Sequence, residues 1–199
     1  MGRYPRNLVL VALLLAANIS LAAPIPAAKF LHAAAALENS HVRFVSGYQR
    51  IAYPMGDVPA NVGVCADVIV RAYRGIGIDL QRLVHEDMER DFAAYPKLWG
   101  LTHPDPNVDH RRVLNLATFF RRHGAALPVS NNARDYKPGD LVTWNLSPHG
   151  STPHIGIVMP LRSADGARPL ILHNLGNGQI VQDVLFSYKI TGHFRYAIG

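Results

Sequence analysis

Beyond Gly139 the chain consists of short apolar runs separated by turn residues, and this pattern constrains the fold more than any other feature. The runs are rich in β-branched and aromatic residues, which favours strands. They read LVTWNL, HIGIVMPL, PLILHNL, IVQDVLF and GHFRYAI. Asp165-Gly166 and Asn177-Gly178 lie between successive runs and are typical of tight hairpin turns. The C-terminal third therefore predicts an antiparallel meander.

The preceding part of the chain has the apolar spacing of amphipathic helices instead. Helices are predicted at about 29–42, 65–73, 80–94 and 110–123. Asn107 or Asp109 is the expected N-cap of the fourth helix. Helices followed by strands indicate an α+β domain with segregated layers rather than a series of βαβ units.

The N-terminal segment has the three parts of a signal peptide. Arg3 and Arg6 supply positive charge, residues 8–17 are apolar, and Ser20-Leu21-Ala22 offers a cleavage site. No cysteine follows to carry a lipid anchor, and the apolar run is short for a membrane span. We predict a signal peptide at 1–22, a mature chain of 23–199, and a periplasmic or secreted protein. An uncleaved N-terminal anchor is the alternative.

The mature chain has the length of one domain with room for a sizeable core, and it shows no internal repeat. Removal of the two arginines of the signal peptide lowers the net charge from +6 to +4. The basic residues are scattered among acidic ones, which excludes a nucleic-acid footprint but suits an anionic environment such as a cell wall. No membrane segment is expected after cleavage.

Cys65 is the only cysteine in the chain and lies where a helix is predicted to begin. Free N–H groups and the dipole at a helix N-terminus stabilise a thiolate, which makes this thiol a candidate nucleophile. A buried structural cysteine is the alternative. Since one cysteine cannot form an internal disulfide, and a thiol at the floor of a cleft is a poor intermolecular partner, we expect a free thiol and no disulfide-linked dimer. A monomer is expected.

Four stretches resemble the NlpC/p60 branch of the papain-like cysteine peptidases, bacterial enzymes that cut peptidoglycan stem peptides. They are Tyr53 and Gly56 before Val64-Cys65-Ala66-Asp67, then Gly139-Asp140-Leu141-Val142-Thr143-Trp144, then His154-Ile155-Gly156-Ile157-Val158, and finally Ile171-Leu172-His173. The whole chain is similar to a bacterial group known as domain of unknown function 1287. The resemblance implies a papain-like α+β fold in which the nucleophile helix packs on a C-terminal antiparallel sheet. Residues 80–134 look like a helical insertion.

The resemblance also implies roles for individual residues. Cys65 would be the nucleophile, His154 the general base and later acid, and His173 the residue that orients His154. Tyr53 matches a family tyrosine that leans towards the nucleophile, with simple packing as its alternative role. Asp67 stands where the family has glycine. It could stabilise the first turn, select a cationic substrate group, or raise the pKa of the thiol.

Strand register decides whether the two histidines can meet. A turn centred on Ser163-Ala164 places His154 directly opposite His173. A turn centred on Asp165-Gly166 keeps them on one face but out of opposition, and a bulge at that turn would reconcile the two registers.

The remaining histidines are scattered, and none pairs at zinc-ligand spacing, so no metal or cofactor is predicted. If the insertion folds over the cleft, His110, Arg111 or Arg112 could meet carboxylates of a substrate. Asp140, at a turn before a strand, is expected to be structural.

The resulting hypothesis is an exported cysteine hydrolase, a peptidase or amidase acting on peptidoglycan stem peptides through a Cys-His-His triad. A non-catalytic envelope-binding module on the same scaffold is one alternative, because a fold does not entitle a chain to a function. A thiol acyltransferase is the other.

Overall fold

The computed structural model describes residues 24–199, so the predicted signal peptide lies outside the described residues. The α-helices are α1 (Ala27–Ala35), α2 (Cys65–Arg74), α3 (Leu80–Arg90) and α4 (Val113–Arg122). The 3-10 turns η1 (Phe92–Ala94) and η2 (Asp109–Arg111) lie between α3 and α4, and η3 (Ala133–Asp135) follows α4 farther along the chain. Strands β1 (Arg43–Phe44) and β2 (Val62–Gly63) form a short parallel pair beside α2. In the described part of the chain no helix is both long enough and apolar enough to cross a membrane.

The main sheet has six strands, all antiparallel, in the order β3-β8-β4-β5-β6-β7. Its members are β3 (Ala126–Leu127), β4 (Leu141–Asn145), β5 (Pro153–Arg162), β6 (Pro169–Asn174), β7 (Gln179–Gln182) and β8 (Lys189–Phe194). Strands β4 to β7 form the predicted meander. The last strand does not extend it: β8 returns to pair with β4 on the other side.

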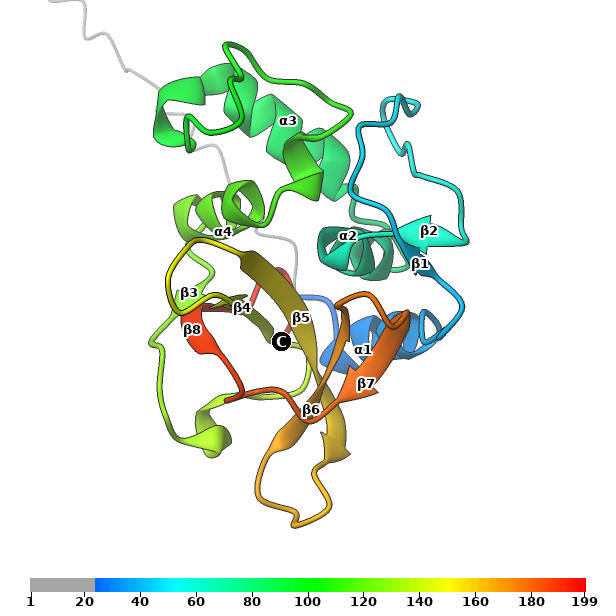
Figure 1. Cartoon of the computed structure of the whole chain (residues 1–199), viewed down its shortest axis with the longest axis vertical. Helices are drawn as coiled ribbons and strands as arrows, with labels where there is room; N and C mark the ends of the chain where they lie inside the picture. The colour runs from blue at the N-terminus through cyan, green and yellow to red at the C-terminus, as the bar shows by residue number, and fades with distance from the viewer. Residues whose placement is uncertain (1–23) are drawn as a thin grey trace, which may run out of the picture.

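Helices α2 and α4 pack on the sheet, and α3 lies on their outer side (Figure 1). Strand alternation divides the apolar side chains between two clusters. Leu141, Ile155 and Ile157 join the helices in the larger cluster, whereas Val142 and Trp144 belong to a smaller cluster on the other face of the sheet. The fold is α+β with segregated layers, as predicted.

Three predicted helices have different bounds in the structure. The third, predicted at 80–94, ends at Arg90, because Asp91 leaves the helical backbone angles and residues 92–94 form the separate turn η1. The first ends at Ala35 rather than Val42, because the backbone of Asn39 exchanges hydrogen bonds of 2.8 and 2.9 Å with that of Gln179. The fourth is split into η2 and α4 by Arg112, which has extended backbone angles. Neither Asn107 nor Asp109 caps α4, so that prediction was wrong; the Asp109 carboxylate is engaged with His85 instead, at 2.8 Å.

Only one of the two candidate registers of the β5–β6 hairpin occurs, and only next to the turn; the inner pairs lie midway between the two candidates. Arg162 pairs with Pro169, as expected for a turn centred on Asp165-Gly166. Farther along, Ile157 pairs with Leu172, so the register shifts within β5 rather than at the turn itself. Direct opposition of His154 and His173 is therefore not reached by the backbone, and their contact depends on the side chains.

Candidate active site

The thiol of Cys65 stands at the first residue of α2. Val64 has extended backbone angles, and the helix begins directly after it. The Val64 N–H donates to the Asp67 carboxylate at 2.7 Å, which is one half of a capping box. Valine has no acceptor to supply the other half. This local geometry leaves the first N–H groups of α2, including that of Cys65 itself, available at the thiol.

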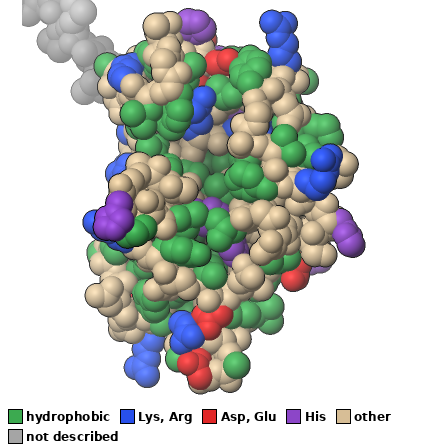
Figure 2. Space-filling model, viewed as in Figure 1, with side chains coloured by type: hydrophobic (Ala, Val, Ile, Leu, Met, Phe, Trp, Pro, Cys, Tyr) green, Lys and Arg blue, Asp and Glu red, His purple; other side chains and the backbone are tan. Residues whose placement is uncertain are grey.

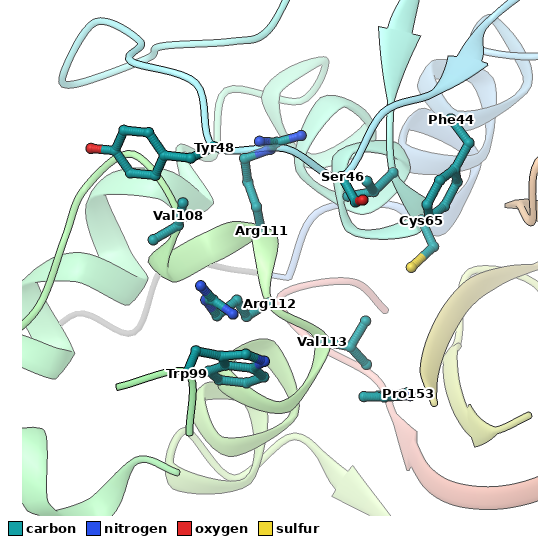
Figure 3. A pocket seen from close by; sticks show the side chains of 11 residues that line it. Phe44, Ser46, Tyr48, Cys65, Trp99, Val108, Arg111, Arg112, Val113 and Pro153 are labelled. Atoms are coloured by element: carbon teal, nitrogen blue, oxygen red, sulfur yellow. The ribbon is translucent and has the colours of Figure 1, made fainter. Parts of the chain in front are cut away.

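A cavity of about 320 Å³ opens at Cys65. Its lining comes from the segment around β1, the start of α2, the predicted insertion and the start of β5: Phe44, Ser46, Tyr48, Val64, Cys65, Trp99, Val108, Arg111, Arg112, Val113 and Pro153. The thiol points into the space between these elements (Figure 3). In the space-filling view, hydrophobic side chains gather around the middle of this face, with histidine side chains visible among them (Figure 2).

A chain of hydrogen bonds connects three side chains on neighbouring strands. His154 Nε2 lies 2.9 Å from His173 Nδ1, and His173 Nε2 lies 3.0 Å from Gln182 Oε1. Since the Gln182 carbonyl oxygen can only accept, His173 Nε2 carries its proton and His173 Nδ1 is an acceptor. The His154 Nε2–H must then donate to it. This network assigns the lone pair of His154 to Nδ1, the nitrogen that remains for a base.

The cysteine and His154 are both neutral at neutral pH. Burial raises the pKa of the Cys65 thiol to about 11. The Asp67 carboxylate also raises this pKa, whereas hydrogen bonds from backbone N–H groups lower it. Burial lowers the pKa of His154 to about 3, and the neighbouring His173 adds to that effect. The pKa of His173 is also lowered by burial. The expectation that Asp67 would raise the thiol pKa is thus met, although burial is the larger cause.

The Cys65 thiol lies close to the backbone of β5 at Ile155, the residue after His154. The Ile155 N–H is among the groups that favour the thiolate. The hydrogen bonds of the described residues do not include one from Sγ to the His154 imidazole. Catalytic hydrogen bonds are often long in a protein without substrate and tighten in the complex.

Gly156 has a steric reason to be glycine. A Cβ there would lie 2.5 Å from the Ile171 side chain and 3.2 Å from the His173 Cβ. Strand β6 can therefore approach β5 closely beside the histidine pair. At the end of β6, Asn174 is fully buried and its amide approaches the Gly63 carbonyl at 3.4 Å, next to the loop that leads to Cys65.

Asp67 and Arg111 form a buried ion pair. The guanidinium donates two hydrogen bonds to the carboxylate, at 2.8 and 2.9 Å, and the two side chains are 6% and 3% exposed. With the bond from Val64, both oxygens of Asp67 are occupied. The geometry therefore supports stabilisation of the first helical turn and leaves no free oxygen for a cationic substrate group.

Two further residues expected near a substrate lie elsewhere. Tyr53 does not line the cavity: its ring packs edge-on against His85, with centroids 5.2 Å apart. His110 is buried and also outside the lining, and burial lowers its pKa to about 3. Residues of the predicted insertion line the cavity, and they include Arg111 and Arg112 but not His110.

Sequence reasoning did not single out Gln182, Trp99 or Tyr48. Gln182 ends a strand, and only the pairing of β6 with β7 brings it to His173. Trp99 and Tyr48 belong to irregular segments with no periodic signal, and both line the cavity. An aromatic residue next to Gly100 in a turn-rich loop was the one available hint.

The described residues contain no cluster of three or more His, Cys, Asp or Glu side chains suited to a metal ion. Asp140 is structural in the way expected. It is fully buried, accepts from Arg195 at 2.7 and 3.0 Å, and lies 2.7 Å from His193 Nε2.

Three comparisons place the chain among known proteins. A family model described as "Domain of unknown function (DUF1287)" matches residues 31–196. The "Uncharacterized protein YijF" of Escherichia coli (strain K12) is 49% identical over 151 residues, covering 76% of this chain and 72% of that protein. A crystal structure described as similar to a lipoprotein of the NLP/P60 family, from Staphylococcus aureus, matches 89% of this chain with a TM-score of 0.43 and 14% identity. The chain spans 45% of that structure's length.

Proposed function

The chain belongs to the DUF1287 family, and from that premise we propose that it is an exported cysteine hydrolase that cuts peptide or amide bonds in peptidoglycan stem peptides. The observation that carries the proposal is the pairing of a cavity-facing thiol at a helix start with a hydrogen-bonded chain that leaves His154 Nδ1 unprotonated. A structural cysteine would need neither feature.

In the first half of the reaction, Cys65 Sγ attacks the carbonyl carbon of the scissile bond and its proton moves to His154 Nδ1. The oxyanion that forms accepts a hydrogen bond from the Cys65 N–H at the start of α2. The C–N bond then breaks, and the leaving amine takes the proton from His154. A thioester between Cys65 and the acyl part of the substrate remains.

In the second half, water attacks the thioester. His154 accepts a proton from the water and returns it to the sulfur as the C–S bond breaks. His173 and Gln182 hold the ring of His154 throughout, because His173 accepts a hydrogen bond from His154 and Gln182 accepts one from His173. The resting pair is neutral, so proton transfer accompanies attack rather than preceding it.

Purified peptidoglycan digested with the mature protein, followed by mass analysis of released fragments, tests this function. We expect wild type to release fragments bearing a new terminus, and Cys65→Ala to release none while keeping its thermal melt. Identical fragment patterns from both proteins would eliminate the hydrolase. Binding to the sacculus without cleavage would identify a binding module, and transfer to an added amine would identify an acyltransferase.

Export to the periplasm or outside the cell, and a monomeric state, belong to the same proposal. N-terminal sequencing of protein recovered from the producing cell checks the first, with a start near residue 23 expected. Light scattering of the purified mature chain checks the second.

A further inference from the structure

The wall of the cavity across from Cys65 is formed by Arg112 and Trp99. The Arg112 guanidinium carbon lies 4.0 Å from the centroid of the Trp99 ring, a stacked cation–π arrangement. The backbone of Trp99 and of the following Gly100 is in the left-handed region, with φ of 63° and 69°. Figure 3 shows the guanidinium lying over the indole, at the edge of the space into which the thiol points.

Arg112 differs from its neighbour Arg111 in having no ionic partner. Arg111 is occupied by Asp67. No described carboxylate forms an ion pair with Arg112, and its Nε is buried without a hydrogen-bond partner. Asp109 and Asp105 act on Arg112 only through space: Asp109 Oδ2 is paired with His85 and Asp105 Oδ1 with Asn107, and Asp109 Oδ1 has no hydrogen-bond partner. The stacking fixes the position of the guanidinium but satisfies none of its donors.

An unpaired, partly desolvated guanidinium is unfavourable, and burial lowers the pKa of Arg112 accordingly. The planar fork matches a carboxylate with two parallel hydrogen bonds. Val113 and Pro153 line the cavity between Arg112 and the thiol, and they suit the apolar part of a short peptide. The cavity thus has a charged end and a nucleophilic end, joined by apolar surface.

We propose that Arg112, stacked on Trp99, is a carboxylate-binding subsite, and that the substrates are peptides with a free carboxylate close to the bond attacked by Cys65. The second half of this statement rests on the proposed hydrolase function, whereas the first half concerns binding alone. Arg112 is a specificity-determining residue in this reading.

Binding to the Cys65→Ala protein tests the subsite without requiring turnover. The probes are two synthetic stem peptides that are identical except that a glutamate carboxylate in one is a carboxamide in the other. We expect the carboxylate peptide to bind about tenfold to a hundredfold more tightly, the range for hydrogen bonds to a charged group. Adding Arg112→Gln should bring the ratio close to one, and Arg112→Lys should leave an intermediate ratio because the charge remains without the fork.

Arg82→Gln is the matched control, because it removes one positive charge from the exposed face of α3 and should leave the ratio unchanged. Thermal melts establish whether each variant is folded. If Arg112→Gln does not fold, Arg112→Lys serves as the test variant instead. Equal binding of both peptides to the Cys65→Ala protein overturns the subsite, and so does a ratio that Arg112→Gln leaves intact. If the Cys65→Ala protein prefers the carboxylate peptide but wild type cleaves neither peptide, the hydrolase function is wrong and the subsite stands. If wild type cleaves both peptides at equal rates, only the subsite is wrong.

Discussion

Burial of the thiol has a direct consequence for its reactivity at the scale of a single residue. A pKa of about 11 means that little thiolate is present at neutral pH. We expect the rate of Cys65 alkylation by iodoacetamide to rise about tenfold per pH unit from pH 7 upward and to level off only near pH 11. A rate that is already constant at pH 7 would contradict this and would identify a resting thiolate–imidazolium pair.

His173 and Gln182 are predicted to act through His154. His173→Ala should lower turnover strongly, up to about 10⁴-fold by analogy with the orienting acid of a serine triad. His173→Gln should lose less, because glutamine still offers one hydrogen bond. Gln182→Leu should cost less again, while Gln182→Glu keeps an acceptor and should retain activity with a shifted pH profile. Hydrolysis rates across pH, with melts for folding, measure this.

Full activity in His173→Ala with an unchanged melt would remove His173 from the site. Asn174 would then be the next residue to test. Equal activity of Gln182→Leu and wild type at every pH would reduce Gln182 to a packing role.

The residues that sequence alone could identify are those that carry their own local context. Cys65 stands at a helix start and His154 and His173 stand in apolar strand runs, so pattern and motif together indicate them. Gln182 has no such context, and Arg112 was a candidate only together with its neighbours His110 and Arg111. Each acquires its position from a partner far along the chain or in a loop, and pairing of that kind is decided by tertiary structure.

At the scale of elements, the start of α2 depends on the Asp67–Arg111 pair. Asp67→Ala should lower the free energy of unfolding by about 3–5 kcal/mol, because it leaves the Arg111 guanidinium buried without a partner. Replacing both, as Asp67→Ala with Arg111→Met, should recover most of that loss. Urea unfolding of the three proteins measures it. A double variant no more stable than Asp67→Ala would mean that the cap on Val64, and not the stranded charge, causes the loss.

Element boundaries show where sequence reasoning stops. The start of α2 at Cys65 follows from a loop-to-helix change in pattern. The end of α1 cannot be predicted in this way, because α1 stops where the backbone of Asn39 pairs with that of Gln179, and no residue near α1 indicates that pairing. The hairpin at Asp165-Gly166 was recognisable from its turn residues, whereas the register shift lies away from the turn, between Val158 and Arg162.

At the scale of the whole molecule, the buried histidines predict loss of stability in acid. His110 and His154 have a pKa of about 3 in the folded protein and about 6.5 when unfolded. The unfolded chain therefore binds their protons first, and each histidine lowers the free energy of unfolding by about 1.4 kcal/mol per pH unit as pH falls from about 6.5 towards 3. The lowered pKa of Asp87 and of Asp140 adds to the loss below about pH 4, while the raised pKa of Asp109 opposes it.

Denaturant unfolding at pH 7, 6, 5 and 4 checks this slope. A folded His110→Leu variant should have a pH dependence of the free energy of unfolding that is smaller by about 1.4 kcal/mol per pH unit, the contribution of one proton. His154→Leu should show the same decrease. A free energy of unfolding that stays constant from pH 7 to 4 in wild type would contradict neutral, buried histidines.

The fold class followed from the order of helical and strand-like runs, but the strand order did not. A chain of five apolar runs predicts a meander, and β4 to β7 obey it. The run around Gly192 carries nothing in its sequence to send it back to β4. In the structure, β8 pairs with β4 and also contacts α4, which are tertiary contacts that the sequence pattern does not contain.

The Asp67–Arg111 pair also says something about how such chains can change over generations. A mutation at either position alone leaves a buried charge without its partner, so the two positions are expected to change together. Lineages are expected to keep both residues or to lose both. A homologue with glycine at the position of Asp67 should therefore carry an uncharged residue at the position of Arg111. A sequence alignment of homologues can check this.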